Sequence, residues 1–140
     1  MKISFTRSDL ALSRFIQKVT GEPVSHVIIE AAGHVIHSNF LGVHAEPRDA
    51  YKPEIVYSVE VPDSYEKLLS LFIKRRGSWY DFGALLYLGL RCLLPWLPKK
   101  NLWACSGMYL CTEWVLEVLE GEEDSMITPY KLYLKLSEKK

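Results

Sequence analysis

A cysteine and a histidine far upstream of it are the residues of this sequence best suited to covalent chemistry. Cys111 opens the segment Cys111-Thr112-Glu113-Trp114-Val115, whose apolar pattern predicts an amphipathic helix, and His26 lies in a short β-branched run. The thiolate is the reactive form of cysteine, and a helix N-terminus beside an imidazolium can lower a thiol pKa of about 8.5 below neutrality. We therefore expect Cys111 to act as a nucleophile and His26 as the base that takes its proton.

A predicted β-hairpin brings a second histidine, His37, close to His26. Two runs rich in β-branched residues flank the turn sequence Ala31-Ala32-Gly33. A two-residue turn at Ala32-Gly33 would make the two histidines diagonal neighbours on one face of the hairpin. A turn at Ala31-Ala32 would pair them directly, whereas a three-residue turn would separate them. In the first two cases His37 can be the third member of the site, which fixes the tautomer of His26.

The remaining histidines do not join this pair in the predicted hairpin. His34 and His37 are three positions apart on one strand and therefore point to opposite faces, which argues against a shared metal ion. His44 follows Gly42, which breaks the strand pattern, and we expect it in a loop without an assigned role. The sequence thus predicts no metal ligand and no cofactor.

Hydrophobic periodicity predicts an α+β fold in which an antiparallel sheet packs against the helix that carries Cys111. Strands are predicted over 2–5, 24–30, 34–39 and 54–61, and helices from Ser8 or Asp9 to Gly21, from Asp63 or Ser64 to Gly77, over 111–120 and over 129–134. The apolar segment 82–97 contains Arg91 and ends between two prolines. It is shorter than the roughly 20 residues that a membrane-spanning helix needs, so we predict no transmembrane span, while peripheral membrane contact through 82–97 remains open.

Composition indicates one folded domain over residues 1–140, with a disordered tail at 136–140. The formal net charge is zero, which gives no electrostatic reason to expect nucleic acid as a partner. The cysteine count is odd, and the spacing forms no disulfide framework. Because the N-terminal segment lacks the apolar core of a secretory signal, we expect the protein in the cytoplasm.

Four short motifs, in this order, resemble those of circularly permuted papain-like cysteine hydrolases. They are Ser25-His26-Val27, Val35-Ile36-His37-Ser38 with Gly42-Val43 after it, Gly77-Ser78-Trp79-Tyr80-Asp81-Phe82, and Leu110-Cys111-Thr112-Glu113-Trp114-Val115. This permuted NlpC group contains the YiiX-type amidases and, more distantly, the lecithin:retinol acyltransferase-like enzymes. The resemblance covers most of the chain, from about His26 to Gly121, and it implies a papain-like fold with Cys111, His26 and His37 as the catalytic residues.

Two departures from the family pattern bear on this assignment. The family sequence Cys-Ser-Glu reads Cys111-Thr112-Glu113 here, and the third catalytic position is often Glu in the amidases but His in the acyltransferase-like enzymes. In addition, Cys105-Ser106-Gly107 resembles the nucleophile motif of unpermuted relatives. We favour Cys111, because an amphipathic helix continues directly from it, whereas Gly107 would weaken a helix that begins at Cys105.

Two functions of different classes follow from these observations. The first is a thiol hydrolase of the amidase or peptidase type, or an acyltransferase, which forms a thioester from an amide, ester or thioester. Its substrate would be a peptide, a peptidoglycan fragment or a lipid-like acyl compound. The second is a catalytically inactive papain-like module with a binding or structural role in a phage or bacterial assembly. In either case Tyr80 and Asp81 are expected to be structural, with an auxiliary role in the site left open for Tyr80.

Overall fold

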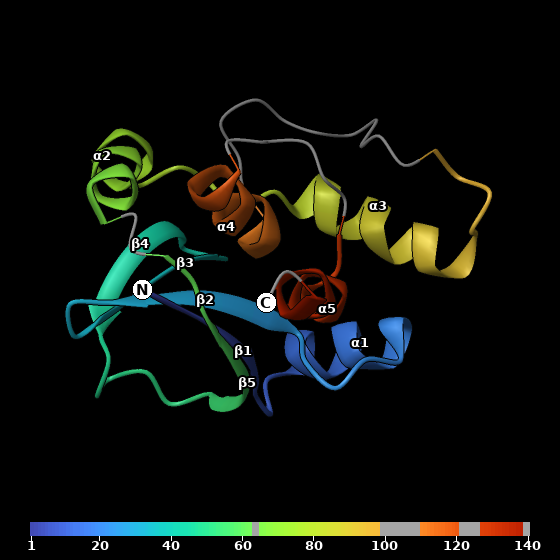
Figure 1. The fold of residues 1–140 in the computed structure, drawn as a ribbon. Coiled ribbons are helices and arrows are strands. Elements are labelled where there is room, and N and C mark those ends of the chain that lie inside the picture. The colour runs from blue at the N-terminus through green and yellow to red at the C-terminus, as the bar shows by residue number, and fades with distance from the viewer. Residues whose placement is uncertain (63–64, 99–109, 121–126, 139–140) are drawn as a thin grey trace.

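The protein has an α+β architecture, as the sequence predicts. The structure, a computed structural model, describes residues 1–62, 65–98, 110–120 and 127–138 (Figure 1). Within these ranges the elements are β1 (Lys2–Arg7), α1 (Ala11–Thr20), β2 (His26–Ala31), β3 (His34–Asn39), β4 (Gly42–Pro47), β5 (Glu54–Glu60), α2 (Tyr65–Arg75), α3 (Phe82–Leu93), α4 (Cys111–Leu119) and α5 (Pro129–Glu138). None of these helices is long and apolar enough to cross a membrane.

A single five-stranded antiparallel sheet forms the centre of the fold, in the order β4-β3-β2-β1-β5. The β2–β3 hairpin uses a two-residue turn, because Ala32 and Gly33 both have positive φ, at 49° and 75°. Positive φ at both central positions is typical of a type I′ turn, whose twist matches that of the strands. The pairing of Ile29 with Ile36 confirms the register in which His26 and His37 are diagonal neighbours.

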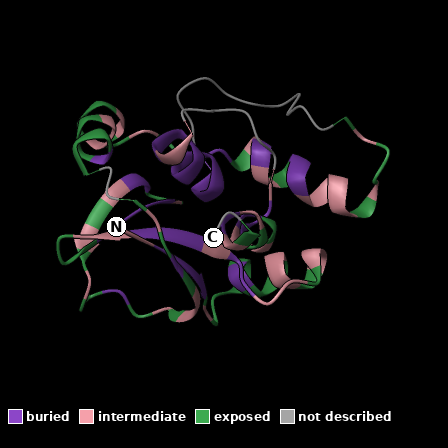
Figure 2. Ribbon diagram, in the orientation of Figure 1, coloured by how far each residue is buried: buried purple, intermediate pink, exposed green. Residues whose placement is uncertain are grey.

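Helices α2, α4 and α5 cover one face of this sheet (Figure 1). Their buried side chains, among them Leu68, Trp114 and Leu132, join residues of the strands in one hydrophobic core. Helix α4 is buried along nearly its whole length, as its purple colour in Figure 2 shows. The predicted antiparallel sheet therefore does pack against the helix that begins at Cys111. Helices α1 and α3 contact each other.

The segment around His44 is a strand, so the predicted loop is wrong. A tight turn at Phe40-Leu41 returns the chain along β3, and Asn39 Oδ1 accepts a hydrogen bond from the Leu41 backbone at 2.8 Å. His44 consequently pairs with His37 across the sheet. Gly42 and Pro47, which in the sequence argue against a strand, stand at its two ends, where a glycine or a proline interrupts little of the ladder.

Two helix boundaries differ from those predicted. Helix α1 begins after Leu10, which has no side-chain group that could cap it, and the backbone N–H of Ser8 donates to Ser13 Oγ at 3.0 Å. Helix α5 continues to Glu138, so residues 136–138 belong to a helix and not to a disordered tail. The side chain of Leu136 is buried in the main core, which holds this last turn in place.

Close backbone contact at Gly42 holds the segment after α2 against the edge strand β4. Val43 N–H donates to Ser78 O at 3.0 Å, and Gly77 N–H donates to Val43 O at 2.9 Å. Gly42 has φ of 86°, and a Cβ there would overlap the carbonyl oxygen of Ser78. This position therefore requires glycine for its backbone conformation and for its space.

We expect Gly42→Ala to lower the free energy of unfolding by about 1–3 kcal/mol more than Gly33→Ala, measured by urea denaturation. Both glycines have positive φ, but a Cβ at Gly33 would meet no atom within 4 Å, so the difference isolates the overlap with Ser78. Equal losses in the two variants would contradict the close contact.

Candidate active site

The polar residues of the site lie on the sheet face opposite to α4. Side chains alternate along a strand, and Val27 and Ile29 of β2 point into the main core. His26, the first residue of β2 and the neighbour of Val27, therefore points to the other face. Because cross-strand partners share a face, His37 of β3 and its partner His44 of β4 lie on that face as well.

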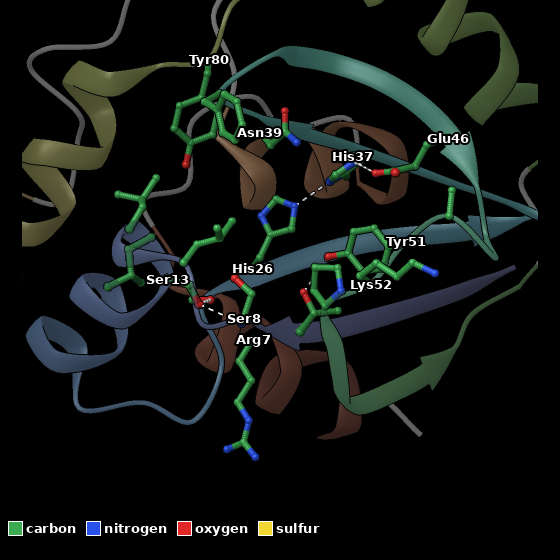
Figure 3. Close-up of a pocket in the computed structure, with 18 residues that line it drawn as sticks. Arg7, Ser8, Ser13, His26, His37, Asn39, Glu46, Tyr51, Lys52 and Tyr80 are labelled. Carbon is green, nitrogen blue, oxygen red and sulfur yellow. Dashed lines mark hydrogen bonds and ion pairs between the residues drawn. The ribbon is translucent and has the colours of Figure 1, made fainter.

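A hydrogen-bonded chain of three side chains leads across this face from β2 to β4. His26 Nε2 lies 2.8 Å from His37 Nδ1, and His37 Nε2 lies 3.0 Å from Glu46 Oε1 (Figure 3). The predicted contact between the two histidines is thus present. Glu46, two residues after His44 on β4, extends the chain by one member that the sequence did not suggest.

The carboxylate at the end of this chain sets the tautomers of both imidazoles. Glu46 accepts, so the ring proton of His37 is on Nε2. Burial, followed by the neighbouring His26 and His44, lowers the pKa of His37 to about 2, so at neutral pH its Nδ1 has no proton and accepts from His26 Nε2. Burial, with a smaller effect of His44, likewise lowers the pKa of His26 to about 4. Neutral His26 therefore presents an unprotonated Nδ1, which is the form of a general base.

A cavity of about 330 Å³ opens beside His26 and His37. Figure 3 shows His26 between Tyr80 and His37 on its wall, with Tyr51 below them. Tyr51 donates to or accepts from Thr6 Oγ1 at 2.9 Å, and burial raises its pKa to about 12. Much of the remaining lining is apolar. It comes from the start of α1, from the turn before β4 and from the segment between β4 and β5: Leu10, Leu12, Ile16, Phe40, Ala50 and Pro53.

Cys111 reaches the site from the other side of the sheet. It is the first residue of α4, it is 5% exposed, and it belongs to the main core. Its sulfur contacts the backbone of Val27, the neighbour of His26, near the point where the regular β2–β3 pairing ends. In the described part of the chain, no hydrogen bond joins Cys111 to His26 or His37.

The environment of Cys111 does not produce the lowered pKa that the sequence predicts. Burial raises the pKa of this thiol to about 11, and it outweighs the opposing hydrogen bonds from the backbone at Val27 and Thr112. The carboxylate of Glu113 raises this pKa further. Glu113 accepts from Leu110 N–H at 2.9 Å and so caps the helix start. The resting site therefore contains a neutral thiol and neutral imidazoles.

The other predicted site residues are placed as follows. Asp81 caps α3, since its Oδ1 accepts from Ala84 N–H at 2.7 Å, and Tyr80 is buried on the cavity wall. Cys105, the rival nucleophile, lies outside the described residues. The sequence analysis does not assign Glu46 or His44 to the site, because it predicts a loop where the structure has β4. Their alternation after the Phe40-Leu41 turn was the signal that could have identified them.

Comparisons with models of known protein families, with curated proteins and with solved structures gave no match. The geometry described above therefore carries the functional argument.

We predict that the ring proton is on Nε2 in His26 and in His37, as the hydrogen-bonded chain to Glu46 requires. In His44 we predict it on Nδ1, which donates to the carbonyl of Gly42 at 3.0 Å. Nitrogen-15 NMR of the imidazoles at neutral pH distinguishes the tautomers. In Glu46→Gln we expect a mixture of tautomers at His37, because an amide can donate as well as accept. A single Nδ1–H form of His37 in the wild type would contradict this chain.

Alkylation of Cys111 by iodoacetamide should be slow at neutral pH and should increase with pH up to about 11. At pH 7 a thiol with a pKa of about 11 contains roughly 300-fold less thiolate than one with a pKa of about 8.5. Mass spectrometry of the alkylated peptides gives the rate at each cysteine, with glutathione as the reference thiol. A rate at Cys111 that reaches its plateau below pH 8 would show that the thiol is activated in the resting protein.

Proposed function

We propose that this protein is a cysteine-dependent acyl hydrolase or acyltransferase that uses Cys111 as the nucleophile and His26 as the base. The observation that carries the proposal is the chain His26–His37–Glu46, which ends on a cavity and leaves Nδ1 of His26 free of a proton. A buried chain of this kind fixes the orientation and the tautomer of a base, as the third residue of a catalytic triad does. The permuted papain-like fold, with this site, belongs to the same proposal.

The neutral resting state determines how the thiol would be activated. With the pKa of Cys111 raised and that of His26 lowered, a stable thiolate–imidazolium pair does not form before substrate arrives. Proton transfer from Sγ to His26 Nδ1 would accompany attack on the carbonyl carbon, which forms the C–S bond of the tetrahedral intermediate. The imidazolium then returns the proton to the leaving group, and water or another acceptor cleaves the thioester. The backbone N–H of Cys111 at the start of α4 is the candidate donor to the oxyanion.

The surroundings of the cavity favour a substrate with an apolar acyl group. Leu10 and Phe40, on its lining, are 62% and 57% exposed, and Leu41 of the same turn and Trp79 next to Tyr80 are exposed as well. Exposed apolar side chains grouped at a cavity are typical of a site for an apolar ligand or a lipid surface. Phe82, Leu86, Leu93 and Trp96 add exposed apolar surface in the segment 82–97. A lipid-like acyl compound therefore fits better than a polar peptidoglycan fragment, and peripheral membrane contact would present it.

The alternative function, an inactive binding module, is favoured by the burial of Cys111 and by the absence of a hydrogen bond to His26 within the described residues. In that case the cavity would bind a ligand, and the thiol would be a packing residue of the core. The two functions differ in one measurable property, which is whether an acyl group is transferred to a cysteine.

Incubation with p-nitrophenyl octanoate should produce an octanoyl thioester on Cys111, which mass spectrometry detects and hydroxylamine removes. Because His26 takes the thiol proton, we expect His26→Ala to form the adduct at least about 100-fold more slowly. Cys92→Ser is the matched control for loss of a thiol outside the site, since Cys92 is a half-buried residue of α3. It should react as the wild type does.

Each other outcome assigns the site differently. An adduct on Cys105 would keep the enzyme and move the nucleophile. Formation of the Cys111 adduct at the same rate in His26→Ala as in the wild type would show that His26 is not the base. The absence of an acyl adduct from all cysteines, in protein that still binds octanoate, would support the binding module.

A further inference from the structure

The face of the sheet that carries the hydrogen-bonded chain also gathers a set of metal ligands. His37, His44 and Glu46 each offer one ligand atom, and these three atoms lie within 4.8 Å of one another. The strand register explains the cluster: His37 and His44 are direct cross-strand partners, and Glu46 follows His44 by two positions on the same face. We propose that these three residues bind a divalent zinc-class metal ion, which would act as an inhibitor of the thiol site.

The side chain of His44 is prepared for coordination. Its Nδ1 donates to the carbonyl oxygen of Gly42 at 3.0 Å, so in the neutral ring Nε2 is the nitrogen with a free lone pair, and it is directed away from that contact. Among the described residues, Nε2 of His44 has no hydrogen-bond partner. A backbone carbonyl that holds the other ring nitrogen is the usual outer partner of a metal-ligating histidine, because it fixes the tautomer and the ring orientation.

The ligand types and distances suit zinc. Two imidazoles and one carboxylate are a common three-ligand set for this ion, with a fourth position left for water. Metal–ligand bonds of about 2.0–2.2 Å in a tetrahedral site place ligand atoms roughly 3.4 Å apart. His37 Nε2 and Glu46 Oε1 are 3.0 Å apart, and the ligand atom of His44 lies within 4.8 Å of both. A shift of at most about 1.4 Å in the position of this atom would therefore give the tetrahedral spacing.

The ion has an access path and replaces an existing contact. The side chain of Glu46 is 31% exposed and lines the cavity, whereas His37 is buried behind it. The carboxylate therefore meets the ion first and supplies the negative charge that attracts it. The ion then takes the place of the ring proton between His37 Nε2 and Glu46.

Coordination would reverse the tautomers of the chain, and this consequence rests on the proposed function. A metal ion on His37 Nε2 moves the ring proton to Nδ1, which then donates to His26 Nε2. The proton of His26 moves in turn to its Nδ1, so the nitrogen that should accept the thiol proton is occupied. No proton is gained or lost by the pair of neutral imidazoles, yet His26 ceases to be a base toward Cys111.

Titration of the full-length protein with Co²⁺ tests the site directly. We expect one equivalent to bind with the visible absorption of nitrogen and oxygen ligation and without a thiolate charge-transfer band. The dissociation constant should increase at least about tenfold in His44→Gln and in Glu46→Gln. His34→Gln, which removes an exposed imidazole from the same strand, is the matched control and should bind as the wild type does.

Equal affinity in the wild type, His44→Gln and Glu46→Gln, or a thiolate band, would overturn the metal site. Thermal unfolding of each variant shows whether it is folded. Because the two substitutions are at separate ligands, the affinity of one variant still tests the site if the other variant is unstable.

Zinc binding should also move the NMR signals of His37 and His26 to those of their Nδ1–H forms, whether or not the protein is an enzyme. If the protein is an enzyme, Zn²⁺ should slow octanoylation of Cys111 in the wild type but not in His44→Gln, compared with the metal-free rate of each. Unchanged tautomers in the zinc-bound protein would overturn the inhibition and leave the proposed function intact.

Discussion

Two tight turns, at Ala32-Gly33 and Phe40-Leu41, hold β2, β3 and β4 in the register on which the site depends. Positive φ at Ala32 and Gly33 selects a two-residue connection, and this connection makes His26 and His37 diagonal neighbours. A slip of one residue in either hairpin would turn every side chain of a strand to the other face. The side chains of the hydrogen-bonded chain would then no longer meet, and the apolar residues that contact α4 would point away from the core.

The same register gives the sheet two different faces. One face is apolar and is covered by α2, α4 and α5, while the other carries histidines, Glu46 and Tyr51 around a cavity. Cys111 belongs to the first face and His26 to the second. They approach each other at the backbone of Val27, and the thiol is buried in the core. This arrangement accounts for a raised thiol pKa at a helix start, where the helix dipole alone would lower it.

The two ring nitrogens of His37 have different partners. Through Nδ1 it contacts His26, and through Nε2 it contacts the carboxylate of Glu46, which can also ligate a metal ion. Because a neutral imidazole has one ring proton, whatever occupies one nitrogen decides the role of the other. A proton between His37 and Glu46 leaves Nδ1 of His26 without a proton, whereas the proposed metal ion in that place would move the proton of His26 from Nε2 to Nδ1. The hydrogen-bonded chain therefore ends on β4, on the sheet face opposite to α4.

The sequence by itself determined the features that depend on local pattern: the helix that starts at Cys111, the β2–β3 hairpin, and the proximity of His26 and His37. Periodicity and turn chemistry act over a few residues, so they can be deduced without the rest of the chain. The position of Cys111 on the opposite face, its raised pKa, and the contribution of His44 and Glu46 were decided only by the tertiary structure. Burial and pKa depend on groups distant in sequence, because desolvation is a property of the packed surroundings and not of the residue.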